Sequence, residues 1–151
     1  METLRTYGRP PFSVAVIHGG PGAGGEMAVV ARELAPELGV LEPLQTATSL
    51  QGQVQELKAV LEKNGDPPVI LIGFSWGAGL SYIAAANYPG LVKKLILVGC
   101  GPFEHGYAAR IQATRSSRLS EEDRAEHESI LKILAGPLPK ANLRRLRGLE
   151  H

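Results

Sequence analysis

The five residues from Gly73 to Gly77 read Gly-Phe-Ser-Trp-Gly and stand between two segments of different character. The apolar run of residues 69–72 precedes them, and a segment rich in small residues, 78–86, follows them. The apolar run favours a buried strand and the second segment favours a helix. The sequence therefore predicts a strand-to-helix corner with Ser75 at its tip.

Such a corner turns so sharply that its central residue is held in a strained backbone conformation. Glycines two positions away on each side then avoid clashes. The hydroxyl of Ser75 would stand at the carboxyl end of the sheet, with the N–H of Trp76 directed to the same place. A buried serine in a glycine-rich turn is the alternative interpretation. A phosphate-binding loop would carry a lysine after its glycine, and none is present.

Short apolar runs alternate with helical patterns along the chain, which is typical of parallel strands joined by crossover helices. The runs are residues 12–17, 40–44, 69–72 and 95–98. Pro43 favours a position at a sheet edge for the second run. We expect the α/β class with three layers: a short parallel sheet of about four strands with helices on both faces.

Two helix starts can be read from the sequence. Thr48 with Gln51 three residues later resembles a capping box, and Ser120 with Asp123 opens a later helix on which His127 shares an apolar face. The length and the 44% hydrophobic content suit a single domain over residues 1–148, with a core at 12–101 and a helical segment at 102–138. Residues 149–151 look like the remnant of an expression tag.

The net charge and the cysteine content limit the kinds of partner and cofactor that the chain is expected to bind. The formal net charge is +1, so the overall balance favours neither nucleic acid nor a membrane surface as partner. Cys100 is the single cysteine and cannot form an internal disulfide or a metal cluster. No secretory or membrane-spanning pattern is visible near the start. We expect a cytoplasmic protein without a cofactor or a metal.

The loop after the first apolar run reads His-Gly-Gly-Pro-Gly, residues 18–22. Acyl transfer by a serine needs hydrogen-bond donors for the oxyanion that forms, and a glycine-rich loop at this place can supply a backbone N–H from Gly19 or Gly20. This N–H and the N–H of Trp76 would form the pair of donors. Each such donor typically raises the rate about a hundred- to a thousandfold.

These two motifs, in this order, resemble the α/β-hydrolase fold, and tryptophan after the serine is similar to the proline iminopeptidase-like branch. The resemblance is strong over residues 12–101 and weaker over 110–134, where the family usually inserts a helical cap. It implies that the four parallel strands are ordered second, first, third, fourth. It also implies a serine hydrolase acting on a small ester or amide. In that family a catalytic acid commonly follows the next strand and a histidine follows the last strand, and the chain offers neither at its usual place.

Other residues must therefore be weighed as partners of Ser75. His105 lies just beyond the fourth run and is a candidate base, and Glu104 is a candidate acid, although adjacent residues do not readily orient each other. The family's histidine at His18 generally has a structural role, and His127 is better explained by packing. Without a base, only about 10³ to 10⁴ of acceleration over water would remain.

Two hypotheses remain open. In the first, the chain is a serine hydrolase whose base comes from an unusual internal position or from a second subunit. In the second, it is a shortened, catalytically weak relative that serves as a ligand-binding or interaction module. The fourth strand would be an open edge, so we expect a homodimer or a covering of that edge by the cap helices.

Overall fold

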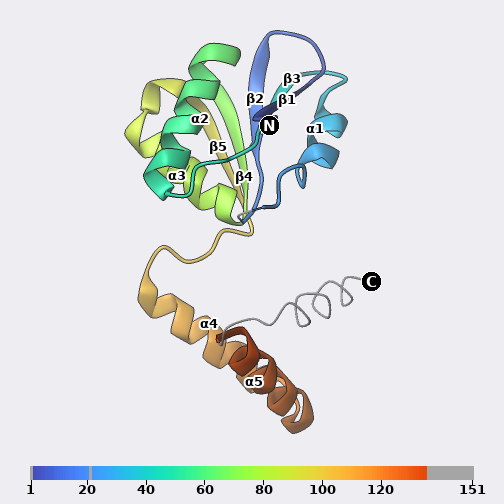
Figure 1. Ribbon diagram of the computed structural model, residues 1–151, viewed down its shortest axis with the longest axis vertical. Coiled ribbons are helices and arrows are strands. Elements are labelled where there is room, and N and C mark those ends of the chain that lie inside the picture. The colour runs from blue at the N-terminus through green and yellow to red at the C-terminus, as the bar shows by residue number, and fades with distance from the viewer. Residues whose placement is uncertain (1, 21, 136–151) are drawn as a thin grey trace. The chain divides into compact units, whose positions relative to one another are not determined.

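The computed structural model describes residues 2–20 and 22–135. The chain forms two compact units, Met1–Phe103 and Glu104–His151. Five strands lie in the first unit (Figure 1): β1 Leu4–Tyr7, β2 Phe12–Ile17, β3 Gly39–Pro43, β4 Val69–Phe74 and β5 Val92–Val98. Its helices are α1 Ala28–Leu34, α2 Leu50–Asn64, α3 Trp76–Asn87 and the 3₁₀ turn Pro89–Leu91. The described helices of the second unit are α4 His105–Arg118 and α5 Glu121–Ala135.

The sheet has the order β1-β3-β2-β4-β5. Strands β3, β2, β4 and β5 are parallel to one another, which confirms the predicted class and the predicted order of the four parallel strands. The first strand, β1, was not foreseen. It reads Leu-Arg-Thr-Tyr, too short and too polar to stand out as an apolar run, and it pairs antiparallel with β3.

Because β1 covers it, β3 is not an edge strand, and the position inferred from Pro43 is wrong. All five residues of β3 are buried. Pro43 is the last residue of the strand and lies opposite Leu4. A proline at the end of a strand removes a single donor there and leaves the rest of the ladder intact, so it does not require an edge.

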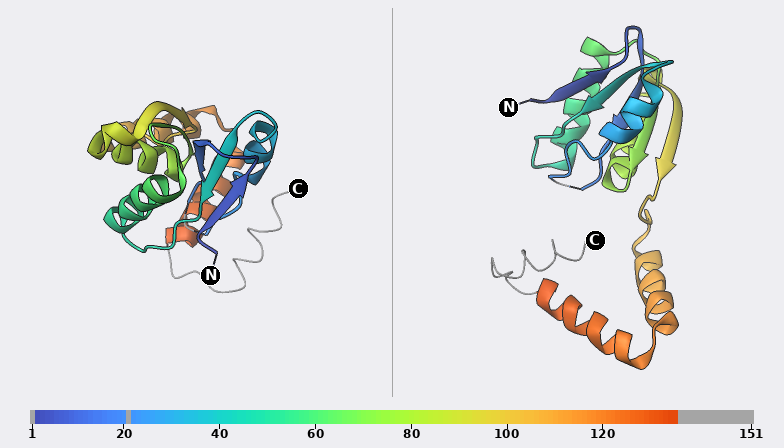
Figure 2. Two further views of the ribbon diagram at one scale, coloured as in Figure 1. Left: turned by 90° about the horizontal axis from the view of Figure 1, so that it is seen from above. Right: turned by 90° about the vertical axis from the view of Figure 1, so that its right-hand side faces the viewer.

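Helices cover both faces of the sheet, as expected (Figure 2). The alternation of side chains along β2 shows the two interfaces. Ala15 and Ile17 belong to the core cluster beneath α2 and α3, and Val14 and Val16 to the cluster beneath α1. Fully burying a side chain of this kind contributes about 1.5–3 kcal/mol, so these two clusters hold the three layers together.

The start of α2 differs from the prediction by one residue. Ser49, not Thr48, is the N-cap, and its hydroxyl accepts a hydrogen bond from Gly52 N–H at 3.1 Å. In the second unit the predicted start of α5 is confirmed, because Ser120 Oγ accepts from Asp123 N–H at 3.1 Å. His127 on α5 is half-buried, in keeping with the packing role expected for it.

Strand β5 pairs with β4 alone among the described strands and therefore forms an edge of the sheet. Its Ile96, Leu97 and Val98 are 39%, 39% and 44% exposed. None of the described helices is both long and apolar enough to cross a membrane.

Candidate functional site

Ser75 occupies the corner between β4 and α3, with φ 51° and ψ −114°. It is the single non-glycine residue with positive φ in the described part of the chain. A backbone conformation of this kind costs about 1–3 kcal/mol and persists only where its surroundings hold it. The predicted strained corner is therefore present in the structure.

Close contacts on both sides hold the corner. Ser75 N–H donates to the carbonyl of Val98 at 2.9 Å, which ties the corner to the end of β5. A Cβ at Gly73 would lie 2.4 Å from the carbonyl oxygen of Gly77. A Cβ at Gly77 would lie 2.4 Å from the carbonyl oxygens of both Ile17 and His18. The two flanking glycines are thus required because backbones approach each other here.

The loop after β2 lies against the corner, as the two motifs predicted. A Cβ placed on Gly19 would be 3.5 Å from Cβ of Ser75. This proximity follows from the topology, because β2 and β4 are parallel neighbours and their carboxyl ends meet at one edge of the sheet.

The structure distinguishes the two glycines considered as donors. Gly19 N–H already donates to Glu26 Oε2 at 2.9 Å. No acceptor for Gly20 N–H is found among residues 2–20 and 22–135. Of the two glycines, Gly20 therefore has its backbone donor free. Glu26 was not singled out by the sequence, where it is a lone acid after a glycine-rich loop.

His18 orients this peptide. The buried ring accepts the N–H of Gln45 at Nε2 (3.3 Å), so its proton lies on Nδ1 and is donated to the carbonyl of Gly19 at 2.9 Å. In a trans peptide the carbonyl and the following N–H point in opposite directions, so His18 directs the N–H of Gly20 away from its ring. With both nitrogens engaged, His18 has the structural role expected for it.

Trp76 is the first residue of α3, where a backbone N–H has no partner within the helix. Its indole Nε1 donates to Oε1 of Gln53 at 2.8 Å. Gln53 is buried on α2, and its Nε2 donates to the carbonyl of Ala47 at 3.0 Å. One amide therefore joins the corner, helix α2 and the loop after β3. A glutamine on a helix carries no motif, so this connection could not be read from the sequence.

A pocket of about 320 Å³ opens beside the corner. Its lining includes Gly20, Trp76, Gln53 and the loop of residues 45–48. Glu56 fastens that loop by accepting the N–H groups of Thr46 and Ala47, each at 3.0 Å, and the hydroxyl of Thr46. Burial alone would raise the pKa of Glu56, but these hydrogen bonds outweigh burial and lower it below its ordinary value.

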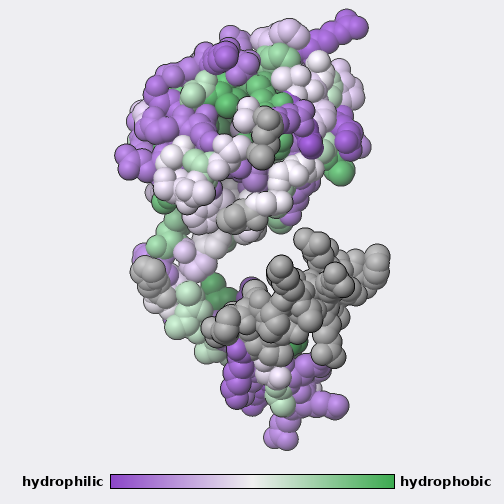
Figure 3. Space-filling model, in the orientation of Figure 1, coloured by the Kyte–Doolittle hydropathy of each residue, from purple (hydrophilic) through white to green (hydrophobic). Residues whose placement is uncertain are grey.

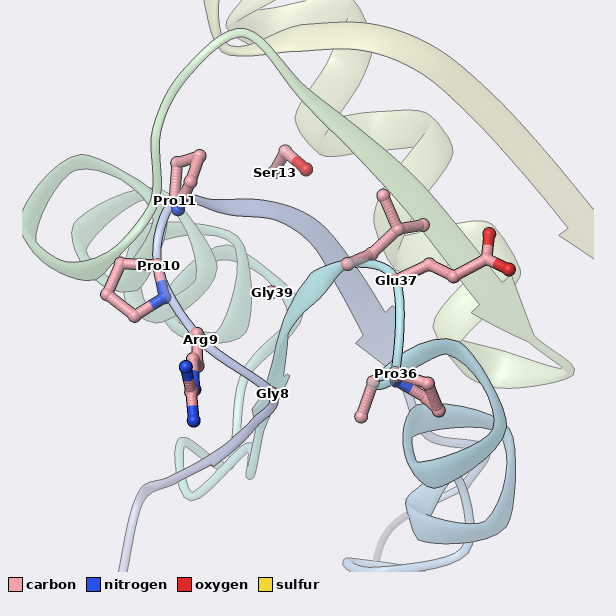
Figure 4. A pocket seen from close by; sticks show the side chains of 10 residues that line it. Gly8, Arg9, Pro10, Pro11, Ser13, Pro36, Glu37 and Gly39 are labelled. Carbon is pink, nitrogen blue, oxygen red and sulfur yellow. The ribbon is translucent and has the colours of Figure 1, made fainter.

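Two other hollows lie away from the corner. One of about 220 Å³ is lined by Thr3, Leu44 and Val60 among others, and Figure 3 shows apolar side chains gathered between α2 and β1. Another, of about 670 Å³, is lined by residues 8–11 and 35–39 (Figure 4). It lies at the amino end of β2, whereas sites in parallel sheets form at the carboxyl ends of the strands.

Glu104 and His105, the candidate acid and base, belong to the second unit. Glu104 is exposed and precedes α4, and His105 is the first residue of that helix. His18 is the one histidine in the sequence of the first unit. In the described residues, no group of three or more His, Cys, Asp or Glu side chains could hold a metal ion.

Comparison with known proteins shows which family has this architecture. The alpha/beta hydrolase fold family matches residues 46–148, more than half of the chain. A comparison with curated proteins finds no significant match. Among solved structures, VinJ superposes with a TM-score of 0.74 at 21% identity, over 95% of this chain and 54% of VinJ.

Two further structures are similar. A thioesterase domain from a curacin biosynthetic pathway has a TM-score of 0.59 at 26% identity, over 79% of this chain and 59% of that domain. An epoxide hydrolase of Bacillus megaterium has a TM-score of 0.59 at 18% identity, over 75% of this chain and 43% of the enzyme. The chain thus spans roughly half the length of these structures. By its family match and its fold, the chain belongs to the α/β-hydrolase fold family.

Proposed function

We propose that the protein is a serine hydrolase that cleaves a small ester or amide through Ser75. The observation that carries the proposal is the approach of the Gly19 loop to the strained Ser75, with 3.5 Å between the Cβ position of Gly19 and Cβ of Ser75. A serine and two backbone donors at one place are two of the three parts that acyl transfer needs, and the third is a base.

The expected reaction has two stages. Oγ of Ser75 attacks the carbonyl carbon of the substrate while a base takes the hydroxyl proton, and the N–H groups of Gly20 and Trp76 stabilise the oxyanion. Collapse breaks the bond to the leaving alcohol or amine, which takes up the proton and departs. Water then attacks the acyl-serine through a second oxyanion, which releases the acid and restores the serine.

The identity of the base that takes the proton of Ser75 is a separate proposal. We propose His105, with Glu104 as the nearby acid, or a histidine from a second copy of the chain. Reaction with a fluorophosphonate probe requires an activated serine, so His105→Ala should abolish labelling if His105 is the base. His127→Ala is the comparison on α5. Loss of labelling in His127→Ala alone would transfer the role to that residue.

Two details of the resemblance bear on substrate and location. Trp76 directly after the serine favours the proline iminopeptidase-like branch, and the 26% identity with a thioesterase domain favours an acyl ester. Both fit the proposed small ester or amide. The single cysteine favours a reducing compartment, and we propose the cytoplasm.

Turnover of a nitrophenyl ester tests the proposal. Ser75→Ala should reduce the enzymatic rate to that of the buffer, because the acyl-enzyme can no longer form. Ser117→Ala, at an exposed position on α4, is the matched control and should keep the wild-type rate. Equal rates for Ser75→Ala and the wild type would remove Ser75 from the mechanism.

The exposed side chains of β5 favour the second candidate function, a catalytically weak module that associates through its open edge. In that case the protein would be a homodimer that fails to react with the fluorophosphonate probe. We propose that residues 102–138 are a cap-like part of the same domain.

A further inference from the structure

We propose that the pocket beside Ser75 binds an uncharged amide group of the substrate, with Gln45 as its recognition residue. This inference rests on the proposed function, because it names the substrate class of the same site. The pocket lining contains Gly20 and Trp76, the two proposed oxyanion donors. A substrate whose reacting carbonyl lies on those donors therefore directs its adjacent atoms into this pocket.

The wall of the pocket is polar but carries no ionisable side chain. Its side-chain polar groups are the amides of Gln45 and Gln53 and the hydroxyls of Thr46 and Thr48. A charged ligand would lose hydration there without gaining a counter-charge, and a hydrocarbon would leave the amide of Gln45 without partners. A neutral group that both donates and accepts hydrogen bonds avoids both costs.

Gln45 has an unused donor and an unused acceptor. Its Nε2 and Oε1 are both buried and have no hydrogen-bond partner among the described residues. Most buried polar side-chain atoms in proteins are paired, and an unpaired one destabilises the fold. The backbone of Gln45 is held by its N–H bond to His18 Nε2 at 3.3 Å. The residue is thus fixed in place while its amide remains unsatisfied.

A carboxamide or peptide group has the same pair of functions as the glutamine amide, one N–H and one carbonyl. It can therefore satisfy both atoms of Gln45 at once. Gln53 makes no hydrogen bond to them, and its amide is instead engaged with Trp76 and Ala47. Gln45 also lines the smaller hollow beside α2, whose other lining is mostly apolar and offers the amide few partners.

Three nitrophenyl esters of similar acyl length test this assignment: N-acetylglycyl, isocaproyl and β-alanyl. The isocaproyl group has the shape of N-acetylglycyl without its amide, and the β-alanyl group carries a cation. Each kcat/KM is divided by the rate of that ester with hydroxide, which removes differences in intrinsic reactivity. We expect the wild type to prefer N-acetylglycyl to isocaproyl by about ten- to a hundredfold.

The Gln45→Leu variant separates recognition from structure. It should lower that preference at least about tenfold while raising Tm by a few degrees, because it removes an unsatisfied buried amide. A purely structural glutamine would instead lower Tm when replaced. Gln51→Leu, on the exposed side of α2, is the control and should leave both the preference and Tm unchanged.

Equal use of the amide and isocaproyl esters, or a preference for the β-alanyl ester, would overturn the assignment. Failure of the proposed function is recognised separately. If Ser75 takes no fluorophosphonate label and no ester is cleaved, the proposed function has failed. NMR titration of Ser75→Ala with N-acetylglycinamide then still tests whether the pocket binds an amide group. Shifts of the Gln45 side-chain NH₂ signals would support it, and their absence would refute it.

Discussion

The backbone N–H of Gly19 donates to Oε2 of Glu26 at 2.9 Å, and this bond leaves Gly20, of these two glycines, with the free donor. The Cβ position of Gly19 lies 2.7 Å from that carboxylate oxygen and 3.5 Å from Cβ of Ser75. Gly19 therefore stands between the carboxylate and the serine, and a Cβ there would collide with the carboxylate oxygen while making ordinary contact with Ser75. Glu26 is, on this geometry, a positioning residue for the loop.

Removing the carboxylate should slow the reaction of Ser75. In Glu26→Ala the loop loses its anchor, and we expect fluorophosphonate labelling to slow about tenfold, as donors that lose their alignment stabilise the oxyanion less. Glu26→Gln keeps an acceptor for Gly19 N–H and should label at close to the wild-type rate. Glu33→Ala, at a different place on the same side of the sheet, is the control. Wild-type labelling by Glu26→Ala would contradict the positioning role.

Two glycines of α3 form a matched pair for stability. Gly77→Ala would place a Cβ 2.4 Å from two carbonyl oxygens of the chain after β2, and should lower the free energy of unfolding by about 3 kcal/mol. Gly79→Ala meets nothing within 4 Å and should raise it by about 0.5–1 kcal/mol, the usual gain on replacing a helical glycine.

Urea denaturation of both variants measures this difference. If Gly77→Ala were as stable as Gly79→Ala, the close approach of α3 to the end of β2 would be refuted.

The serine corner could be predicted because it depends on a local pattern, and the order of the parallel strands because the two motifs resemble the α/β-hydrolase fold. Apolar runs and flanking glycines mark β2, β4 and Ser75. Strand β1 could not be found, because an edge strand needs few apolar residues. Because β1 lies outside β3 in the sheet, β3 is not an edge strand, and the edge position predicted from Pro43 is wrong.

Glu56 makes the pocket loop sensitive to acid. Hydrogen bonds from the loop hold the pKa of Glu56 below its ordinary value of 4.5, so the ionised form stabilises the folded state. That contribution is fully present above the ordinary pKa and is lost as the pH falls through the lowered value. The half-exposed position limits it to about 1 kcal/mol.

Comparing the wild type with Glu56→Gln measures this contribution. The wild type should have the higher free energy of unfolding at neutral pH, and the difference should shrink as the pH falls below the ordinary pKa. A difference that is the same at neutral and at strongly acidic pH would show that the charge of Glu56 does not fasten the loop.

The exposed edge of β5 predicts self-association. We expect sedimentation equilibrium to give the mass of a dimer for the wild type and of a monomer for Leu97→Lys, because a charge on an edge strand opposes pairing. Val29→Lys, at an exposed position on α1, should remain dimeric. A monomeric wild type would contradict the predicted association through this edge.

Only part of the candidate site could be predicted from the sequence. Ser75, Trp76 and the glycine loop belong to short motifs and could be named in advance. Glu26, Gln45 and Gln53 contribute through contacts that span from seven to 27 positions of the chain, and no local pattern marks them. Their roles depend on which N–H groups and amides remain unpaired, which becomes visible only in three dimensions.

The central claim is that Ser75 is an activated nucleophile. Mass spectrometry of the protein after reaction with a fluorophosphonate probe tests it most directly. We expect one adduct, located on Ser75 and absent from the Ser75→Ala variant. An unlabelled wild-type protein, or equal labelling of the wild type and Ser75→Ala, would contradict the claim.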